Sequence, residues 1–89
     1  MGRRRILVVD DEVLVRQILS ETLADAGYET AEAGDGDRAI DMLADSAVFD
    51  LLLTDISMPG PTDGNALALR AKRLCPGIPV IYLATAPTA

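Results

Sequence analysis

The sequence predicts an α/β fold in which helices cover both faces of a parallel sheet. Two short aliphatic runs bounded by turn residues, 6–9 and 51–53, are typical of strands that are buried on both faces. Segments with helical spacing of apolar residues alternate with such runs, and the connections between them are short. Right-handed crossovers then make the strands parallel, so the expected order of elements is β-α-β-α-β-α-β.

The first predicted helix follows the strand at 6–9. Its apolar face has the steps of three and one that a helix requires, and its members are Val15, Ile18, Leu19, Thr22, Leu23 and Ala26. The polar residues between them, Arg16 and Ser20 included, are expected to cover most of the solvent side. We expect Asp11 or Glu12 to cap the start of this helix and Gly27 to end it in the left-handed conformation.

The second strand is predicted at 28–33, at an edge of the sheet, because its residues alternate poorly between apolar and polar. Asp35 is a candidate N-cap for the second helix, which is expected to end near residue 45. The apolar stripe of that helix is Ala39, Ile40, Leu43 and Ala44. The third strand is predicted at 49–54, with Asp55 at its tip.

The loop after the third strand is expected to be stiff, because Pro59 and Pro61 each fix a φ angle. Asp63 can cap a third helix over 65–74. The apolar residues of that helix include Ala66, Leu67, Leu69 and Ala71. A fourth buried strand is predicted at 80–83.

The composition restricts the classes of function. The chain has 89 residues, which fits one domain, and a formal net charge of −6, which disfavours direct binding of nucleic acid. The sequence has no histidine, so a Ser/His triad and a histidine metal site are excluded. Cys75 is the only cysteine, which rules out an intrachain disulfide and fits a reducing cytoplasm. No apolar run is long enough to span a membrane.

Two of the predicted strands end in carboxylates. Asp10 and Asp11 follow the strand at 6–9, and Asp55 ends the third strand. If these strands lie side by side and parallel, the three acids converge on one pocket at the carboxyl edge of the sheet. The alternative is that these acids only cap turns and helices, where Asp is common.

Three acids at one point resist ionisation unless a cation accompanies them. Oxygen ligands alone favour a hard ion, and Mg²⁺ needs only one or two protein carboxylates. Asp11 and Asp55 can bind such an ion directly, while Asp10 holds a coordinated water and the backbone carbonyl of Ser57 supplies another ligand. Next to the metal, an oxygen of Asp55 becomes a credible nucleophile toward a phosphoryl group.

These segments resemble the receiver domain of bacterial two-component response regulators. Residues 6–12 (ILVVDDE) are similar to the first strand and acid pair of that family, and residues 53–60 (LTDISMPG) to its phosphorylation segment. Residues 61–64 (PTDG) resemble the longer variant of the next loop, and residues 78–81 (IPVI) the entry to the fourth strand. The resemblance extends over residues 5–86.

The resemblance implies a flavodoxin-like, doubly wound sheet in the order 2-1-3-4. It also implies a signalling domain rather than an enzyme, and the single cysteine fits the cytoplasm. Asp55 would take a phosphoryl group from the phosphohistidine of a sensor histidine kinase or a phosphotransfer protein. Asp10 and Asp11 would hold Mg²⁺, helped by Asp55 and the Ser57 carbonyl. Thr85, beyond the fourth strand, is the candidate for the hydroxyl that senses the acyl phosphate in this family.

The chain departs from the family pattern in several places. The usual position of the switch hydroxyl is Ala84, so either Thr85 reaches the phosphoryl group through a shifted turn or the hydroxyl is missing. No catalytic lysine is present, because the only lysine, Lys72, is expected at the surface of the third helix.

We interpret residues 1–89 as one receiver-like domain that lacks the last helix, strand and helix. The fourth strand and one sheet face would then be uncovered, which predicts a homodimer or higher oligomer formed through either surface. The rival expectation is that the chain is a fragment.

Two other classes of function stay open from the residues alone. A truncated pseudo-receiver would act as a protein-binding or dimerisation module without phosphoryl transfer, and the missing lysine points that way. A small Mg²⁺-dependent phosphohydrolase would also use an aspartyl nucleophile. Such enzymes commonly carry a second Asp two residues after the nucleophile, where this chain has Ser57. We expect protein partners and neither nucleic acid nor a membrane.

Overall fold

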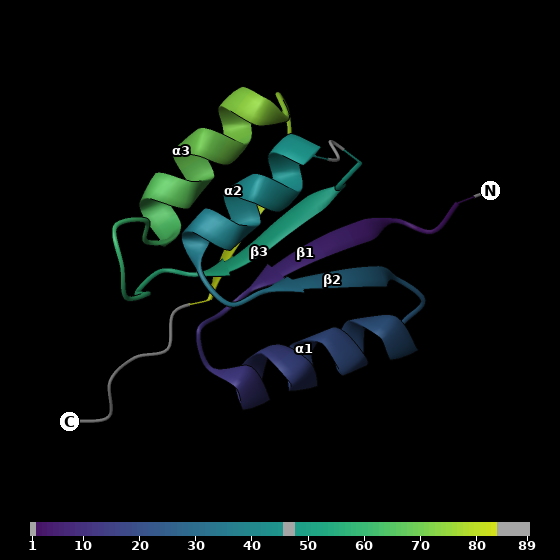
Figure 1. The fold of residues 1–89 in the computed structure, drawn as a ribbon. Coiled ribbons are helices and arrows are strands. Elements are labelled where there is room, and N and C mark those ends of the chain that lie inside the picture. The colour runs from purple at the N-terminus through teal and green to yellow at the C-terminus, as the bar shows by residue number, and fades with distance from the viewer. Residues whose placement is uncertain (1, 46–47, 84–89) are drawn as a thin grey trace.

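Four parallel strands and three helices make up the described part of the chain (Figure 1). The computed structural model describes residues 2–45 and 48–83. In chain order the elements are β1 (Arg5–Val9), α1 (Val13–Asp25), β2 (Glu29–Ala33), α2 (Gly36–Asp45), β3 (Leu51–Asp55), α3 (Gly64–Leu74) and β4 (Val80–Leu83). None of these helices combines the length and the hydrophobicity that a membrane crossing requires.

The strands form one sheet in the order β2-β1-β3-β4, and each neighbouring pair is parallel. β1 and β3 are therefore the central strands, with Leu7 opposite Leu52. Figure 1 shows α1 on one face of the sheet and α2 with α3 on the other. These observations confirm the predicted flavodoxin-like, doubly wound sheet with β2 at an edge.

The face under α2 and α3 holds the main hydrophobic core. Successive strand residues point to opposite faces, so Leu7 and Val9 lie on this side and Ile6 and Val8 on the other. The buried members of the main core are Leu7, Val9, Ala33, Ala39, Leu43, Phe49, Leu52, Met58, Leu67, Ala71 and Ile78. Full burial of each large aliphatic side chain contributes about 1.5–3 kcal/mol, so this face supplies most of the stability.

The face under α1 has a smaller core. Its buried members are Ile6, Val8 and Leu53. The α1 side chains that pack against them, Leu19 and Leu23, are only partly buried. The hydrophobic effect is roughly proportional to the apolar area removed from water, so α1 is held to the sheet more weakly than α2 and α3.

The buried face of α1 differs from the predicted one. Ile18, predicted to be buried, is 62% exposed, whereas Ser20, predicted on the solvent side, is buried. Val15, Leu19 and Leu23 of the predicted face are partly buried, as is Arg16, and Ser20 is the buried residue of α1. The other predicted members, Thr22 and Ala26, are exposed. Because apolar residues surround most of this helix, their spacing alone could not choose between the two faces.

Three of the four predicted helix caps are confirmed, at the starts of α2 and α3 and at the end of α1, and the predicted cap at the start of α1 is not formed. Asp35 and Asp63 each accept a backbone N–H from the first turn of their helix, at 2.7 and 2.9 Å. Gly27 follows α1 with φ of +100°, the left-handed conformation predicted for it. At the start of α1, Glu12 is the N-cap residue but makes no capping bond, and no bond from Asp11 replaces it within the described chain.

The prediction that β4 is a buried strand was wrong, whereas the expectation that the fourth strand is uncovered agrees with the described residues. Ile81 is 50% exposed and Tyr82 is 41% exposed, while the flanking Val80 and Leu83 are only partly buried. β4 lies at the edge of the sheet and pairs only with β3 in the described part of the chain. The apolar run predicted a strand correctly, but burial depends on neighbours that the run itself does not encode.

Candidate functional site

Three acids lie close together at the carboxyl ends of β1 and β3. The register places Val9 opposite Thr54, so Asp10 and Asp55 follow on neighbouring strands at the same edge of the sheet. One carboxylate oxygen from each of Asp10, Asp11 and Asp55 lies within 4.8 Å of the others. Asp10 is 1% exposed and Asp55 is 6% exposed, whereas Asp11 is open to solvent. The predicted convergence of these acids is confirmed.

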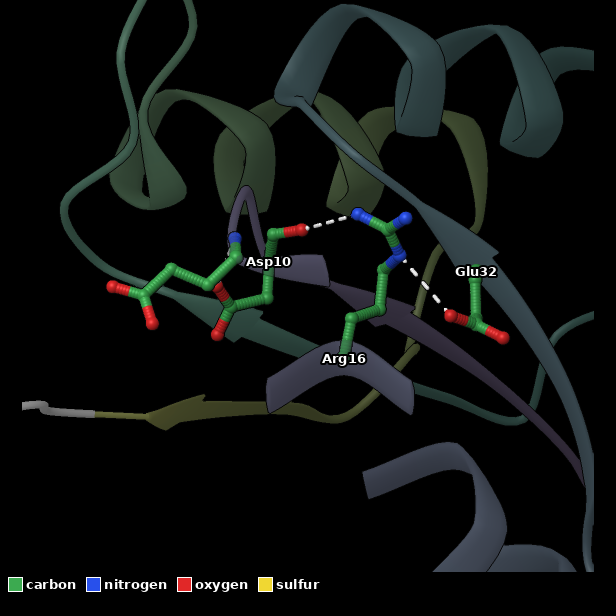
Figure 2. Close-up of polar contacts among 4 residues, drawn as sticks. Asp10, Arg16 and Glu32 are labelled. Atoms are coloured by element: carbon green, nitrogen blue, oxygen red, sulfur yellow. Dashed lines mark hydrogen bonds and ion pairs between the residues drawn. The ribbon is translucent and has the colours of Figure 1, made fainter. Parts of the chain in front are cut away.

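Asp10 is fixed through both its backbone and its side chain. Its N–H donates to the carbonyl of Ala33 at 3.2 Å, and its Oδ1 accepts the N–H of Glu12 at 2.9 Å. Its carbonyl oxygen accepts a hydrogen bond from Nη1 of Arg16 at 2.8 Å (Figure 2). The position of this residue is therefore set by β2 and α1 as well as by β1.

The surroundings of Asp10 disfavour its charged form. Burial raises the pKa of the Asp10 carboxyl above its ordinary value, and the negative charges of Asp55 and Asp11 raise it further. The N–H of Glu12 and the charge of Arg16 lower this pKa without cancelling the increase. A cation among the three carboxylates would relieve this repulsion.

The backbone of Asp55 is held on two sides. The hydroxyl of Thr54, itself fully buried, donates to the Asp55 carbonyl at 3.0 Å. The N–H of Gly64, the first residue of α3, donates to the carbonyl of Ile56 at 3.0 Å. A Cβ at Gly64 would collide with the carbonyl oxygen of Asp55, so only glycine allows this approach. Sequence reasoning missed this contact, although a glycine directly after the capping Asp63 was its signal.

The loop between β3 and α3 is docked against the start of α2. Thr62 Oγ1 donates to Oδ1 of Asp37 at 2.6 Å, and a Cβ at Gly36 would collide with Thr62. Ser57 lies in this loop, two residues after Asp55, and is exposed. The role of its carbonyl as a metal ligand stays a prediction.

Lys72 and Thr85, the other two residues singled out in the sequence, are not part of the described acid cluster. Lys72 is exposed in the last turn of α3, as predicted. Thr85 lies outside the described residues. The described site therefore consists of the three carboxylates and the groups that position them.

The donor set of the cluster fits a hard divalent cation. Carboxylate oxygens are the ligands that Mg²⁺ and Ca²⁺ prefer. Two oxygens on opposite sides of a Mg²⁺ ion are separated by about 4.2 Å, given Mg–O distances of about 2.1 Å. Oxygens of Asp10, Asp11 and Asp55 lie within 4.8 Å of one another, so a small movement of their side chains would bring them within this distance. The three carboxylates can thus hold a metal ion.

Comparison with known proteins identifies the family. The profile of the response regulator receiver domain matches residues 6–88. Chemotaxis protein CheY of Pseudomonas aeruginosa is 44% identical over 81 residues, which cover 89% of this chain and 64% of that protein. Sensor histidine kinase RcsC of Salmonella typhimurium is 38% identical over 76 residues, which cover 85% of this chain and 8% of that protein. The chain thus spans less than two thirds of the length of either relative.

A solved structure has the same arrangement of elements. The receiver domain from hybrid histidine kinase CckA superposes with a TM-score of 0.82 at 38% identity, covering 88% of this chain and 72% of that chain. This likeness in fold agrees with the parallel sheet of four strands in the order β2-β1-β3-β4. The chain belongs to the receiver domain family of response regulators.

Proposed function

We propose that this chain is a phosphoacceptor in two-component signal transduction and that Asp55 takes the phosphoryl group. The donor is a phosphohistidine on a sensor histidine kinase or a phosphotransfer protein. One observation carries the proposal: oxygens of Asp10 and Asp11 lie within 4.8 Å of an oxygen of Asp55, at the carboxyl end of a buried strand. Membership of the receiver family supports the same role.

We further propose that Mg²⁺ binds at this cluster. The carboxylates of Asp10, Asp11 and Asp55 would hold the ion, together with the backbone carbonyl of Ser57. When bound, the ion offsets the negative charge of the transferred group. The oxygen-only donor set and the raised pKa of Asp10 support a cation here, because both indicate an excess of negative charge in a buried place.

In the proposed transfer, Asp55 is the nucleophile. One oxygen of its carboxylate forms a bond to phosphorus while the bond from phosphorus to the donor nitrogen breaks, and the nitrogen keeps that electron pair. The product is an acyl phosphate on Asp55. The hydrogen bond from Thr54 and the close approach of Gly64 hold the Asp55 backbone, which restricts where its carboxylate can lie when the donor arrives.

Substitution of Asp55 tests this proposal. The wild-type chain, Asp55→Asn and the matched control Asp41→Asn should each be incubated with Mg²⁺ and a small acyl phosphate donor, and their intact masses compared. Asp41 is an exposed residue of α2, so its loss changes the net charge equally without touching the cluster. We expect one added phosphoryl group on the wild type and the control, and none on Asp55→Asn.

Two results would contradict the assignment. Labelling that persists in Asp55→Asn would move the phosphoacceptor to another residue. A wild-type chain that takes up no phosphoryl group from any donor, including a phosphorylated kinase domain, would favour the protein-binding module instead.

We also propose that residues 1–89 work as a receiver-like signalling domain in the cytoplasm rather than as a free-standing enzyme. The family supports a signalling role, and the single cysteine fits a reducing compartment. The net charge of −6 favours protein partners over nucleic acid or an anionic membrane surface.

Self-association is a further part of this proposal. Ile81 and Tyr82 expose about half of their surface on β4, an edge strand. Exposed apolar edges recruit other strands, so β4 is the surface through which two copies would pair. Exposed apolar side chains of helix α1, including Leu14 and Ile18, offer a second surface for the same purpose.

A further inference from the structure

Arg16 connects the acid cluster to the edge of the sheet. It lies in the first turns of α1, and its side chain is 18% exposed. Its Nη1 donates to the carbonyl oxygen of Asp10 at 2.8 Å, and its Nε donates to Oε1 of Glu32 at 3.1 Å. Figure 2 shows the guanidinium between Asp10 and Glu32, with one bond to each. One side chain of α1 thus joins the end of β1 to β2.

The surroundings of Arg16 favour this one arrangement. Gly34 follows β2, and a Cβ at this position would come within 3.2 Å of Nη1 of Arg16. The planar guanidinium presents its donors in a fixed fork, so bonding through two of its nitrogens fixes its orientation as well as its place. A side chain at position 34 would therefore press on this guanidinium.

The ion pair between Arg5 of β1 and Glu29 of β2 is longer and more exposed than the pair between Arg16 of α1 and Glu32 of β2. Arg5 and Glu29 are 3.7 Å apart, and their side chains are 37% and 54% exposed. Such exposed pairs contribute little, typically about 0–1 kcal/mol. The pair lies at the opposite end of β1 and β2 from the acids, since Arg5 is opposite Glu29 and Val9 is opposite Ala33. It is therefore a natural control for Arg16 and Glu32.

The atom that Arg16 holds bears directly on the acid cluster. The carbonyl of Asp10 belongs to the peptide group that links Asp10 to Asp11, two of the three clustered acids. Rotation of this peptide would redirect the side chains on both sides of it. The Asp10 N–H and Oδ1 are already bound to Ala33 and Glu12, so the bond from Arg16 completes the fixation of this segment.

We propose that Arg16, braced by Glu32, is a positioning residue that orients the Asp10–Asp11 peptide so that both carboxylates are preorganised for a divalent cation. This inference rests on the proposed function, because it assumes a cation at the cluster. Groups that orient metal ligands typically change metal affinity by about 10- to 100-fold when they are removed.

Simple electrostatics makes the opposite prediction, which allows a decisive test. The positive charge of Arg16 close to the cluster repels a cation, so its removal should tighten Mg²⁺ binding if charge were its only effect. If Arg16 acts by positioning, its removal weakens binding. Arg16→Lys keeps the positive charge but loses the forked donors of the guanidinium. If only charge matters, the Mg²⁺ affinity of this variant should equal that of the wild type. If Arg16 positions the peptide, the affinity should be weaker.

The experiment is a calorimetric titration of Mg²⁺ into the wild type, Arg16→Met, Arg16→Lys and the control Arg5→Met. We expect affinity about ten-fold weaker for Arg16→Met and several-fold weaker for Arg16→Lys. Arg5→Met should bind as the wild type does, even if it unfolds at a lower temperature. Circular dichroism checks that each variant is folded before titration.

A second measurement needs no metal. The amide proton of Glu12 is bonded to Asp10 Oδ1, so its exchange with solvent reports how well this segment is held. We expect faster exchange of the Glu12 amide in Arg16→Met and Arg16→Lys than in the wild type and Arg5→Met, with no metal added.

The outcomes separate this inference from the proposed function. Equal or tighter Mg²⁺ binding by both Arg16 variants, when the wild type binds, would overturn the positioning role and leave the phosphoacceptor proposal intact. A wild-type chain that binds no Mg²⁺ would overturn the proposed metal site and this inference with it.

Discussion

The surroundings of the Asp10 carboxyl favour its protonated, neutral form. Burial and the neighbouring acids raise its pKa in the folded state, so the folded chain holds this proton more tightly than the unfolded chain does. Between the ordinary Asp pKa of about 3.9 and the raised value, unfolding releases a proton. The free energy of unfolding therefore falls as the pH rises through that window. Below this pH window Asp10 is protonated in both states, so burying its charge costs no stability. Above the window Asp10 is charged in both states, and the full cost of burying that charge lowers the free energy of unfolding.

Asp10→Asn tests this account at the residue scale. Asn keeps an oxygen that can accept the Glu12 N–H but removes the buried charge, so the free energy of unfolding at pH 7 without metal should rise. The difference from the wild type should shrink as the pH is lowered toward about 4. Urea denaturation over this pH range measures both effects. A variant less stable than the wild type at pH 7 would show that the carboxylate is stabilising there.

Added Mg²⁺ gives the matching control for this residue. A bound cation stabilises the folded chain by mass action, so Mg²⁺ should raise the stability of the wild type. It should raise that of Asp10→Asn less, because one of the three carboxylates has been neutralised. Equal stabilisation of both proteins would mean that Asp10 takes no part in holding the ion.

At the scale of elements, the junction between β3 and α3 is the tightest part of the site. Gly64 at the start of α3 lies directly against the carbonyl of Asp55, and the loop before it is tied to α2 through Thr62 and Asp37. The helix, the loop and the strand end therefore behave as one unit. A shift of α3 must move the residue that we propose as phosphoacceptor.

Gly64→Ala should disturb stability and phosphorylation together. The added Cβ would collide with backbone rather than with a flexible side chain, so we expect a loss of about 1–3 kcal/mol in the free energy of unfolding. Labelling of Asp55 should also slow in the fraction that remains folded, because α3 must move away from β3. The control is Asn65→Ala, an exposed position one residue later, which should keep both properties. If Gly64→Ala keeps wild-type labelling and stability, the backbone between β3 and α3 can shift to make room for the added Cβ without disturbing Asp55.

At the scale of the whole molecule, the two sheet faces are unequal. The face under α2 and α3 is closely filled, whereas α1 covers the other face with partly buried leucines and leaves Val13, Leu14 and Ile18 exposed. On the same molecule β4 exposes Ile81 at an edge of the sheet. Apolar surface of this kind favours contact with another chain.

Ile81→Lys tests whether β4 forms that contact. A charge on an edge strand opposes edge-to-edge pairing, so the variant should be monomeric at micromolar concentrations where the wild type self-associates. Sedimentation velocity measures this directly. The control is Leu69→Lys, which places the same charge at an exposed position of α3, and it should associate as the wild type does. A wild type that is monomeric throughout would remove self-association from the proposal.

The site was predictable in part because its strands are buried on both faces. Such strands appear in the sequence as aliphatic runs, so β1 and β3 were found together with Asp10, Asp11 and Asp55 at their ends. The caps Asp35 and Asp63 were found for a related reason, since a cap bonds within three residues of itself. These features are local, and the sequence alone was sufficient to predict them.

Other features of the site depend on residues that are far apart in the chain. Ser20 rather than Ile18 faces the sheet, because packing against β1 and β2 selects the side of α1. The bridge from Arg16 to Asp10 and Glu32 exists only once α1 and β2 lie beside the end of β1. Local sequence patterns specify which strands form and which acids end them. The packing of helices on the sheet determined how those acids are held, because each supporting contact joins segments that are separate along the chain.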